Sequence, residues 1–220
     1  MSFVRLRHME PADLVRFNNI NLDEWTEMYT NSFYLEYMVK HKVICFVAQT
    51  LDGALAGYIL AKMEGAGFKN CSVLEDDAAN VRRLEEYTGN IQRSGRPGRS
   101  PLTIRDWHSH ISALSVAPEY RRAGVASLLL DKFEAVSEAH NCWFADLFVR
   151  CSNTLAISVY KKRGYYVYRR IKGYYSGQED AFDMRRPLHR DFLSLSIQNA
   201  GYSVSTEDLY KEQGEVDHDV

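Results

Sequence analysis

The sequence predicts one α/β domain in which about seven strands alternate with about four helices. Two observations lead to this prediction. The chain has 220 residues, 45% of them hydrophobic, which is enough for one good core and too little for two. From residue 107 to residue 188, apolar runs typical of strands alternate with segments that have helical spacing.

The strands are predicted from short apolar or alternating runs bounded by turn residues. Residues 3–7, for example, alternate apolar and basic side chains, as a half-buried strand does, and a turn around Asp52 and Gly53 joins two later runs. The expected strands span residues 3–7, 43–50, 54–63, 107–118, 143–149, 165–171 and 180–188.

The helices are predicted from capping residues and apolar spacing. Pro11 suits a first helical turn, and Ser32 is the expected N-cap of the next helix. Between these two helices, residues 18–30 are polar and irregular and predict a loop. The expected helices span residues 9–14, 32–39, 127–133 and 153–164.

Two regions break this pattern. Residues 64–105 contain an acidic run and a basic run rich in Gly and Pro, around a middle part that allows a short helix. A tolerated surface insertion is the simplest interpretation, and contact with a partner or with ribosomal RNA is the alternative. Residues 189–220 have little apolar periodicity and predict a tail that is ordered only in part. We therefore expect a domain over residues 1–188, with the insertion, followed by this tail.

Composition and charge exclude several classes of function. The formal net charge of −2 argues against a general nucleic-acid binder. The four cysteines form no C-x-x-C pair, so a structural zinc site is disfavoured and no metal is expected. The N-terminus lacks the apolar segment of a signal peptide, and no apolar run reaches the roughly 18 residues of a membrane span. We expect a soluble, cytosolic protein without a membrane or sequence-specific nucleic-acid partner.

A short glycine-containing stretch follows the apolar run at residues 111–118 and precedes a helical pattern. Its sequence is Arg121-Arg122-Ala123-Gly124-Val125-Ala126. A strand that leads through such a turn into a helix presents backbone N–H groups without a partner in the helix, at the positive end of its dipole. Gly124 lets the backbone approach a ligand, and the small Ala123 and Ala126 leave room for it. The stretch predicts a pyrophosphate cradle, with an ordinary strand-to-helix turn as the alternative.

A second motif lies one strand further along the chain. Asn153 is a plausible N-cap, and Ala156 and Tyr160 fall on one helical face at the i, i+4 spacing. Gly164 is expected to end this helix. Together, the motifs R-x-x-G-x-A and N-x-x-A-x-x-x-Y-x-x-x-G-Y resemble the acetyl-CoA site of the Gcn5-related N-acetyltransferase (GNAT) superfamily.

The resemblance extends to one branch of that superfamily, the catalytic subunits of NatB-type amino-terminal acetyltransferases. The segments similar to these subunits span residues 17–23, 26–27, 33–35, 107–108 with His110, 113–119, 146–150, 174–176 and 180–185. For the fold, the resemblance implies a central twisted sheet, mixed and mostly antiparallel, flanked by helices. For the activity, it implies acetyl transfer from acetyl-CoA to the α-amino group of protein N-termini that begin Met-Asp, Met-Glu, Met-Asn or Met-Gln.

The same resemblance implies partners and a place of action. Acetyl-CoA is the expected cosubstrate, and nascent polypeptide N-termini are the expected acceptors. A large helical-repeat auxiliary subunit of the TPR type is expected to bind the N-terminal helices and loops, where residues 25–37 are rich in aromatic side chains. The complex is expected to act co-translationally at the ribosome.

Individual roles also follow from the resemblance. Tyr160 is implied to lie near the thioester sulfur and to protonate the departing thiolate, with a core aromatic as the alternative. His110 shares a strand face with His108 and is implied to be a water-mediated base or a contact to the second substrate residue, with a surface or core histidine as the alternative. The implied CoA-binding residues are Leu114, Ser115, Val116, Arg121, Arg122, Ala123, Gly124, Val125, Ala126, Asn153 and Tyr160. The implied peptide-binding residues are Glu27, Tyr29, His110, Tyr174 and Tyr175.

Two other functions remain open from the sequence. An enzyme acting on internal lysines or small amines would need a stronger base than an α-amine, whose pKa is about 7.7–8.0, because the lysine pKa is about 10.4. That base is usually a glutamate on the central strands, where this sequence is expected to place His108 and His110 and no glutamate. A non-catalytic acyl-CoA-binding module is the other alternative.

Overall fold

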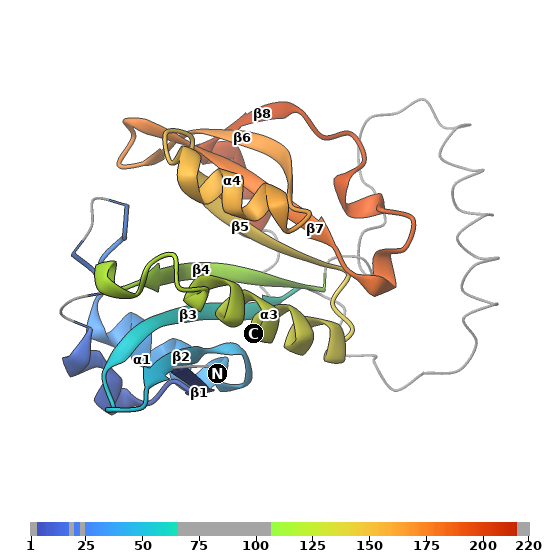
Figure 1. Cartoon of the computed structure of the whole chain (residues 1–220). Coiled ribbons are helices and arrows are strands. Elements are labelled where there is room, and N and C mark those ends of the chain that lie inside the picture. Colours follow the sequence, from blue (N-terminus) through green and yellow to red (C-terminus); the bar gives the residue numbers. More distant parts are fainter. Residues whose placement is uncertain (1–3, 18–19, 23–24, 66–106, 215–220) are drawn as a thin grey trace, which may run out of the picture.

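The computed structural model describes residues 4–17, 20–22, 25–65 and 107–214, whose strands form a single sheet (Figure 1). The sheet has eight strands in the order β1-β2-β3-β4-β5-β7-β6-β8. They are β1 (Val4–His8), β2 (Phe46–Thr50), β3 (Leu55–Glu64), β4 (His108–Val116), β5 (Phe144–Arg150), β6 (Tyr166–Tyr175), β7 (Glu179–Pro187) and β8 (Tyr202–Ser205). Only the β4–β5 and β6–β8 pairs are parallel. The expected mixed, mostly antiparallel sheet is confirmed, with one strand more than expected.

Four α-helices lie in the described residues, and three of them match expected helices. They are α1 (Asn31–Lys40), α3 (Val125–Ala139), α4 (Thr154–Lys162) and α5 (Thr206–Gly214). Short 3₁₀ helices connect the larger elements: η1 (Pro11–Arg16), η2 (Lys42–Ile44), η4 (Pro118–Tyr120), η5 (His189–Asp191) and η6 (Leu195–Ile197). The expected insertion at residues 64–105, with its possible short helix, falls almost entirely outside the described residues.

Two local expectations near the N-terminus are wrong. The helix expected over residues 9–14 is the 3₁₀ helix η1. The N-cap of α1 is Thr30 and not Ser32, because the Phe33 N–H donates to Thr30 Oγ1 at 3.4 Å. Ser32 lies two residues after the N-cap, and its hydroxyl oxygen lies 2.8 Å from that of Thr30. Either hydroxyl fits a capping pattern, and only the backbone geometry selects between them.

The main hydrophobic core lies between the sheet and the helices. On α3, Leu129, Leu130 and Phe133 are completely buried, and their spacing places them on one helical face. Figure 1 shows α3 running along β3 and β4. On α4, Ile157 and Tyr160 belong to the same core as side chains of β5. Burial of each large apolar side chain contributes roughly 1.5–3 kcal/mol, so this core fixes both helices on the sheet.

The C-terminal segment adds structure that its sequence pattern did not predict. Strand β8 pairs in parallel with β6, from Arg169↔Tyr202 to Lys172↔Ser205, and α5 follows directly. The segment was expected to be ordered only in part, because a four-residue strand with two serines has no apolar periodicity. Its pairing partner, the outer edge of β6, exists only in the folded protein.

Candidate active site

The sheet opens at its centre, where β4 and β5 separate. Their parallel pairing in the described residues runs from Ser109↔Ala145 to Ile111↔Leu147. Beyond that point β4 continues along β3, and β5 continues along β7 (Figure 1). Two strand edges in the middle of the sheet therefore face each other without a ladder, so their backbone groups are available to a ligand.

Backbone N–H groups of β4 point into this opening. The Ala117 N–H, just after β4, donates to the Ala56 carbonyl of β3 at 2.9 Å. Because the polar groups of successive strand residues point to opposite sides, the N–H groups of Leu114 and Val116 point away from β3. The Ser115 N–H points toward β3, and the Ser115 hydroxyl donates to the Ile20 carbonyl at 3.0 Å. Ser115 therefore ties β4 to the N-terminal segment, while Leu114 and Val116 present their main chain to the opening.

The predicted cradle lies at the end of the opening, in the turn before α3. Gly124 has φ +83°, a conformation that favours glycine, and a Cβ built on it meets no atom within 4 Å. The first α3 bond runs from the Leu128 N–H to the Gly124 carbonyl at 3.0 Å. The N–H groups of Val125 and Ala126 precede it and have no carbonyl to reach within the helix. The turn thus combines space with backbone donors at a helix N-terminus.

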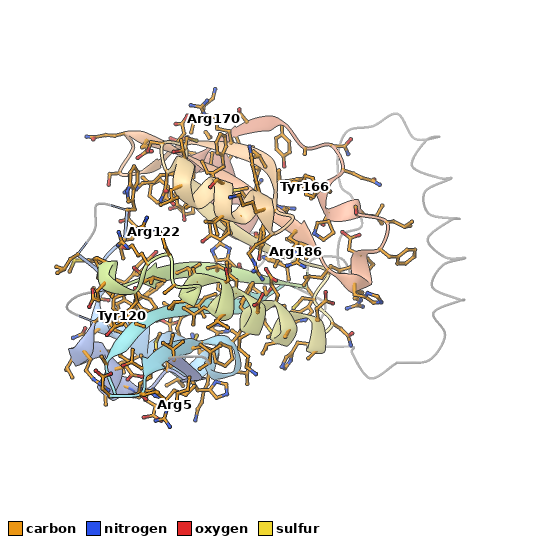
Figure 2. The ribbon with its side chains drawn as sticks, in the orientation of Figure 1. Arg5, Tyr120, Arg122, Tyr166, Arg170 and Arg186 are labelled. Carbon is orange, nitrogen blue, oxygen red and sulfur yellow. The ribbon has the colours of Figure 1, made fainter. Side chains whose placement is uncertain are left out.

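The two arginines of the cradle have different surroundings. Arg121 donates from Nε to the Val116 carbonyl at 3.0 Å, which holds the turn against the end of β4. Arg122 is exposed, has φ +59°, and lies between the start of α3 and the α4 side of the molecule (Figure 2). Both add positive charge beside the backbone donors.

Tyr160 lies on α4, whose two ends match the sequence expectation. The predicted N-cap is confirmed, because the Ala156 N–H donates to Asn153 Oδ1 at 3.0 Å, and Gly164, with φ +84°, ends the helix as expected. The Tyr160 side chain is buried and packs edge-on against Tyr165, with 5.6 Å between ring centroids. Burial raises the pKa of Tyr160. The phenol therefore stays neutral at physiological pH and keeps a proton that it can donate.

His110 is paired with a buried carboxylate. The two residues face each other in the parallel β4–β5 register, and His110 Nδ1 lies 2.9 Å from Asp146 Oδ1. Burial would raise the pKa of Asp146, but the charges of His110 and His108 and the hydrogen bond with His110 lower it. Asp146 is therefore a carboxylate that fixes the orientation of the His110 ring and leaves its other nitrogen, Nε2, for other partners.

Charged side chains continue this pair across the sheet. Lys62 on β3 is the register partner of His110, and Arg185 on β7 is the register partner of Asp146. Arg185 also donates to Asp183 at 3.1 Å, and Asp183 is completely buried. A row of polar and charged side chains, Lys62, His110, Asp146 and Arg185, therefore crosses four strands at the closed end of the opening.

A glutamate also lies at this end, contrary to the sequence expectation. Glu64 on β3 is the register partner of His108, and its Oε1 lies 3.5 Å from His108 Nε2. Glu64 also forms an ion pair with Lys62. Burial would raise the pKa of Glu64, but the hydrogen bond with His108 and the charges of His110 and Lys62 lower it from 4.5 to about 2. A carboxylate with so low a pKa is a weak base.

The pKa of Glu64 predicts a pH-dependent contribution to stability. Because the folded pKa lies below the unfolded value of about 4.3, the stabilisation is complete above that value and is lost as the pH falls toward 2. We expect Glu64→Gln to melt at a lower temperature than the wild type at pH 6, and the difference to shrink as the pH falls to about 3. Thermal melts over this range measure it. A difference that does not change with pH would contradict the assignment.

Aromatic side chains extend from His110 along the β5–β6 side of the opening. Phe148 lies edge-on to His110 with 5.1 Å between ring centroids, and Tyr174 lies edge-on to Phe148 at 5.1 Å. Tyr175 follows at 5.0 Å from Tyr174, and the Arg150 guanidinium lies 4.1 Å from the Tyr175 ring centroid. We call Phe148, Tyr174 and Tyr175 the aromatic wall. It joins the two tyrosines expected at the peptide site to His110.

The N-terminal loop reaches this wall. Glu27 forms an ion pair with Arg150, the residue that stacks on Tyr175. Tyr29 donates from its hydroxyl to the Ser112 carbonyl on β4 at 3.3 Å. Burial, with the charge of Glu27, raises the pKa of Tyr29 to about 12, so Tyr29 is a neutral donor. Loop, β4 and β6 thus meet around one opening.

In the structure, His110 lies where β4 and β5 are paired, with the aromatic wall beside it, and the turn at residues 121–126 follows the far end of β4. Tyr160 lies buried on α4. Sequence reasoning did not assign roles to Glu64, Asp146, Arg150 or Lys62. Each sits inside or at the end of a strand, and its partner lies on a neighbouring strand. A charged residue inside an apolar run was the only available signal, since strand register cannot be read from one sequence.

Two further findings concern the described part of the chain. No group of three or more His, Cys, Asp or Glu side chains in it is arranged to hold a metal ion. None of its helices combines the length and apolar character needed to cross a membrane.

Comparison with known proteins places this geometry in a family. The acetyltransferase (GNAT) family matches residues 14–165. The N-terminal acetyltransferase B complex catalytic subunit naa20 of Schizosaccharomyces pombe is 40% identical over 201 residues, which cover 89% of this chain and 91% of the relative.

Solved structures agree with this family. The crystal structure of Chaetomium thermophilum Naa20 in complex with a bisubstrate analogue is 35% identical, with a TM-score of 0.74 over 94% of this chain and 99% of that chain. A structure of the NatB acetyltransferase complex bound to CoA and MES has a chain that is 31% identical, with a TM-score of 0.62 over 84% of this chain and 99% of that chain. The chain therefore belongs to the GNAT acetyltransferases and, within them, to the Naa20 family of N-terminal acetyltransferase catalytic subunits.

Proposed function

We propose that this chain transfers the acetyl group of acetyl-CoA to the α-amino group of protein N-termini that begin Met-Asp, Met-Glu, Met-Asn or Met-Gln, as the catalytic subunit of a NatB-type complex. The observation that carries the proposal is the opening between β4 and β5, which has the Gly124 turn before α3 at one end and His110 at the other. It joins a site for a phosphorylated carrier to a site for a peptide.

The residues of the opening fit CoA. The relative of known structure in the NatB complex was solved with CoA bound. In this chain the N–H groups of Val125 and Ala126 would hold the pyrophosphate, with Arg121 and Arg122 adding positive charge and Gly124 leaving the space free. The N–H groups of Leu114 and Val116 would orient the pantetheine arm and the thioester oxygen. Acetyl-CoA supplies the activated thioester.

Three groups of this chain handle the amine and the protons. Because an α-amine has a pKa of about 7.7–8.0, a usable fraction is neutral near pH 7, and a weak base is enough. His110, held by Asp146, takes up the amine proton through a water molecule. Tyr160, kept neutral by burial, donates its proton to the departing sulfur. Most of the rate enhancement comes from aligning the amine with the thioester.

The peptide site lies between the N-terminal loop and the aromatic wall. Tyr174 and Tyr175 supply hydroxyl donors to the extended peptide backbone and an apolar slot for the first side chain. Glu27 holds Arg150 against Tyr175 and so keeps the loop against the wall. His110, at the inner end, is placed to contact the polar second residue.

The partner is proposed to be a large helical-repeat auxiliary subunit, with the assembly acting at the ribosome in the cytoplasm. The N-terminal part of the chain offers an apolar surface for it. Met28 is 79% exposed and Val39 is 81% exposed, and Trp25 and Leu35 are also exposed. Large apolar side chains gathered in this way are typical of protein interfaces. Purification of the native protein as a monomer would count against the partner.

The specificity is tested with short peptides. The protein, with and without its auxiliary subunit, is incubated with acetyl-CoA and peptides that begin Met-Asp, Ser-Ser or Met-Leu, or that carry a blocked N-terminus and an internal lysine. We expect clear preference for Met-Asp. Preference for Ser-Ser or Met-Leu would overturn the specificity, and absence of turnover with CoA bound would favour a non-catalytic module.

Glu64 is the one observation that favours a lysine acetyltransferase. It lies on a central strand beside His108, where such enzymes usually carry their base. However, its pKa of about 2 and its ion pair with Lys62 make it unsuited to deprotonate a lysine. Preferred turnover of the internal-lysine peptide would restore this alternative.

A further inference from the structure

The C-terminal segment is docked on the same hairpin that carries the aromatic wall. Gly201 donates its N–H to the Tyr168 carbonyl on β6 at 2.8 Å, and β8 then pairs with β6. At the start of α5, Thr206 donates its hydroxyl to the Lys172 carbonyl at 2.6 Å. Ser205 caps the helix by accepting from the Asp208 N–H at 3.1 Å. The segment is thus attached along β6 as far as the residues before Tyr174.

One side chain of α5 reaches beneath the wall. Leu209 is 1% exposed and packs with Ile171 of β6 and Ala181 of β7, both completely buried. These three residues form a small core of their own, separate from the main core. The partly buried side chains packed against it are Phe148, Tyr174, Tyr175 and Val204. All three members of the aromatic wall therefore rest on a core to which the C-terminal helix contributes.

We propose that α5, through Leu209, positions the aromatic wall and thereby sets the affinity for the peptide but not for acetyl-CoA. The inference rests on the proposed function, because it takes the wall to be part of the peptide site. Leu209 is a positioning residue, since it acts through Tyr174 and Tyr175. Within the wall, ring contacts with centroid distances of 5.0–5.1 Å lead from Tyr175 through Tyr174 and Phe148 to His110.

The effect is limited to peptide affinity because the small core under the wall is separate from the main core. The helices α3 and α4, which carry the cradle and Tyr160, pack into the main core through Leu129, Leu130 and Ile157. A space left by a smaller residue at position 209 is filled by movement of its own neighbours, which are the hairpin and the wall. The cradle precedes α3, whose buried side chains belong to the main core and not to the small core of Leu209.

The test uses the full-length chain purified with its auxiliary subunit, and the peptide that the wild type prefers. The main variant is Leu209→Ala. The matched control is Glu207→Ala, which changes an exposed residue of the same helix. Leu209→Met keeps the apolar volume, and Thr206→Val removes only the hydroxyl that bonds the Lys172 carbonyl. Initial rates give KM for peptide and for acetyl-CoA, and calorimetry gives Kd for CoA.

We expect Leu209→Ala to raise the peptide KM about tenfold and Thr206→Val to raise it less, with unchanged values for acetyl-CoA. Leu209→Met and Glu207→Ala should behave like the wild type. An unchanged peptide KM, or an equal loss of affinity for both substrates, would overturn the proposal, because either result indicates a merely structural helix. If Leu209→Ala fails to fold, Thr206→Val tests the proposal: its peptide KM must rise relative to its acetyl-CoA KM.

Failure of the proposed function gives a different result. A wild type that prefers a start other than Met-Asp refutes the specificity, whereas the ratio between variant and wild type on the preferred peptide still tests α5.

Discussion

The Gly124→Trp variant is expected to fold and to lose acetyl-CoA binding. A Cβ at Gly124 meets no atom within 4 Å, so the indole would occupy open space where the pyrophosphate is proposed to lie. The left-handed φ of +83° adds roughly 1–2 kcal/mol of strain, which a domain of this size tolerates. We expect Kd for CoA to rise about 100-fold or more, which corresponds to about 2.7 kcal/mol. Calorimetric titration measures it.

Gly164 provides the matched control for this variant. It has φ +84° and also no atom within 4 Å of a built Cβ, so Gly164→Trp carries the same backbone strain and the same added bulk. Gly164 lies at the end of α4 and not at the N-terminus of a helix. Equal loss of CoA binding in both variants would indicate strain rather than a blocked cradle, and retained binding in Gly124→Trp would remove the cradle from the site.

The second large effect is expected for Tyr160→Phe, which should bind CoA normally and turn over slowly. The substitution keeps the ring and its edge-on contact with Tyr165 and removes only the hydroxyl. Because loss of a general acid typically costs about 10²–10⁴ in rate, we expect kcat to fall within that range while Kd for CoA stays unchanged. Steady-state kinetics and calorimetry separate the two quantities.

Tyr165→Phe is the control for the loss of a buried hydroxyl. Tyr165 lies 5.6 Å from Tyr160, is 1% exposed, and its hydroxyl has no hydrogen-bond partner among the described atoms. Its removal should leave kcat near the wild-type value. Unchanged turnover in Tyr160→Phe would exclude Tyr160 from the proton transfer.

The helix caps and glycine turns around the candidate site were largely predictable from the sequence. Gly164 ends α4 with a positive φ, as predicted, and Asn153 caps α4 as its position predicted. These features depend on residues within a few positions of each other, so the local sequence contains the needed information. The prediction of Ser32 as an N-cap failed because two hydroxyl residues, Thr30 and Ser32, lie within one turn of the same helix start.

The charged end of the opening was not predictable. The pairing of His110 with Asp146 and of His108 with Glu64 depends on strand register between segments that are 36 and 44 residues apart in the chain. A shift of one residue would turn these side chains to the other face of the sheet, and the sequence of a single strand does not state its register. The same holds for β8, whose edge on β6 is formed by tertiary contacts.

The order of strands and helices from β4 to β7, the glycine turn before α3 and the family of the chain were therefore determined by the sequence itself, because periodicity, caps and a glycine turn act over short distances. The tertiary structure alone decided which side chains meet: Asp146 behind His110, Arg150 between Glu27 and Tyr175, and Leu209 beneath the aromatic wall. These contacts join residues far apart in the chain, and they form only when the sheet assembles and its strands take up a register.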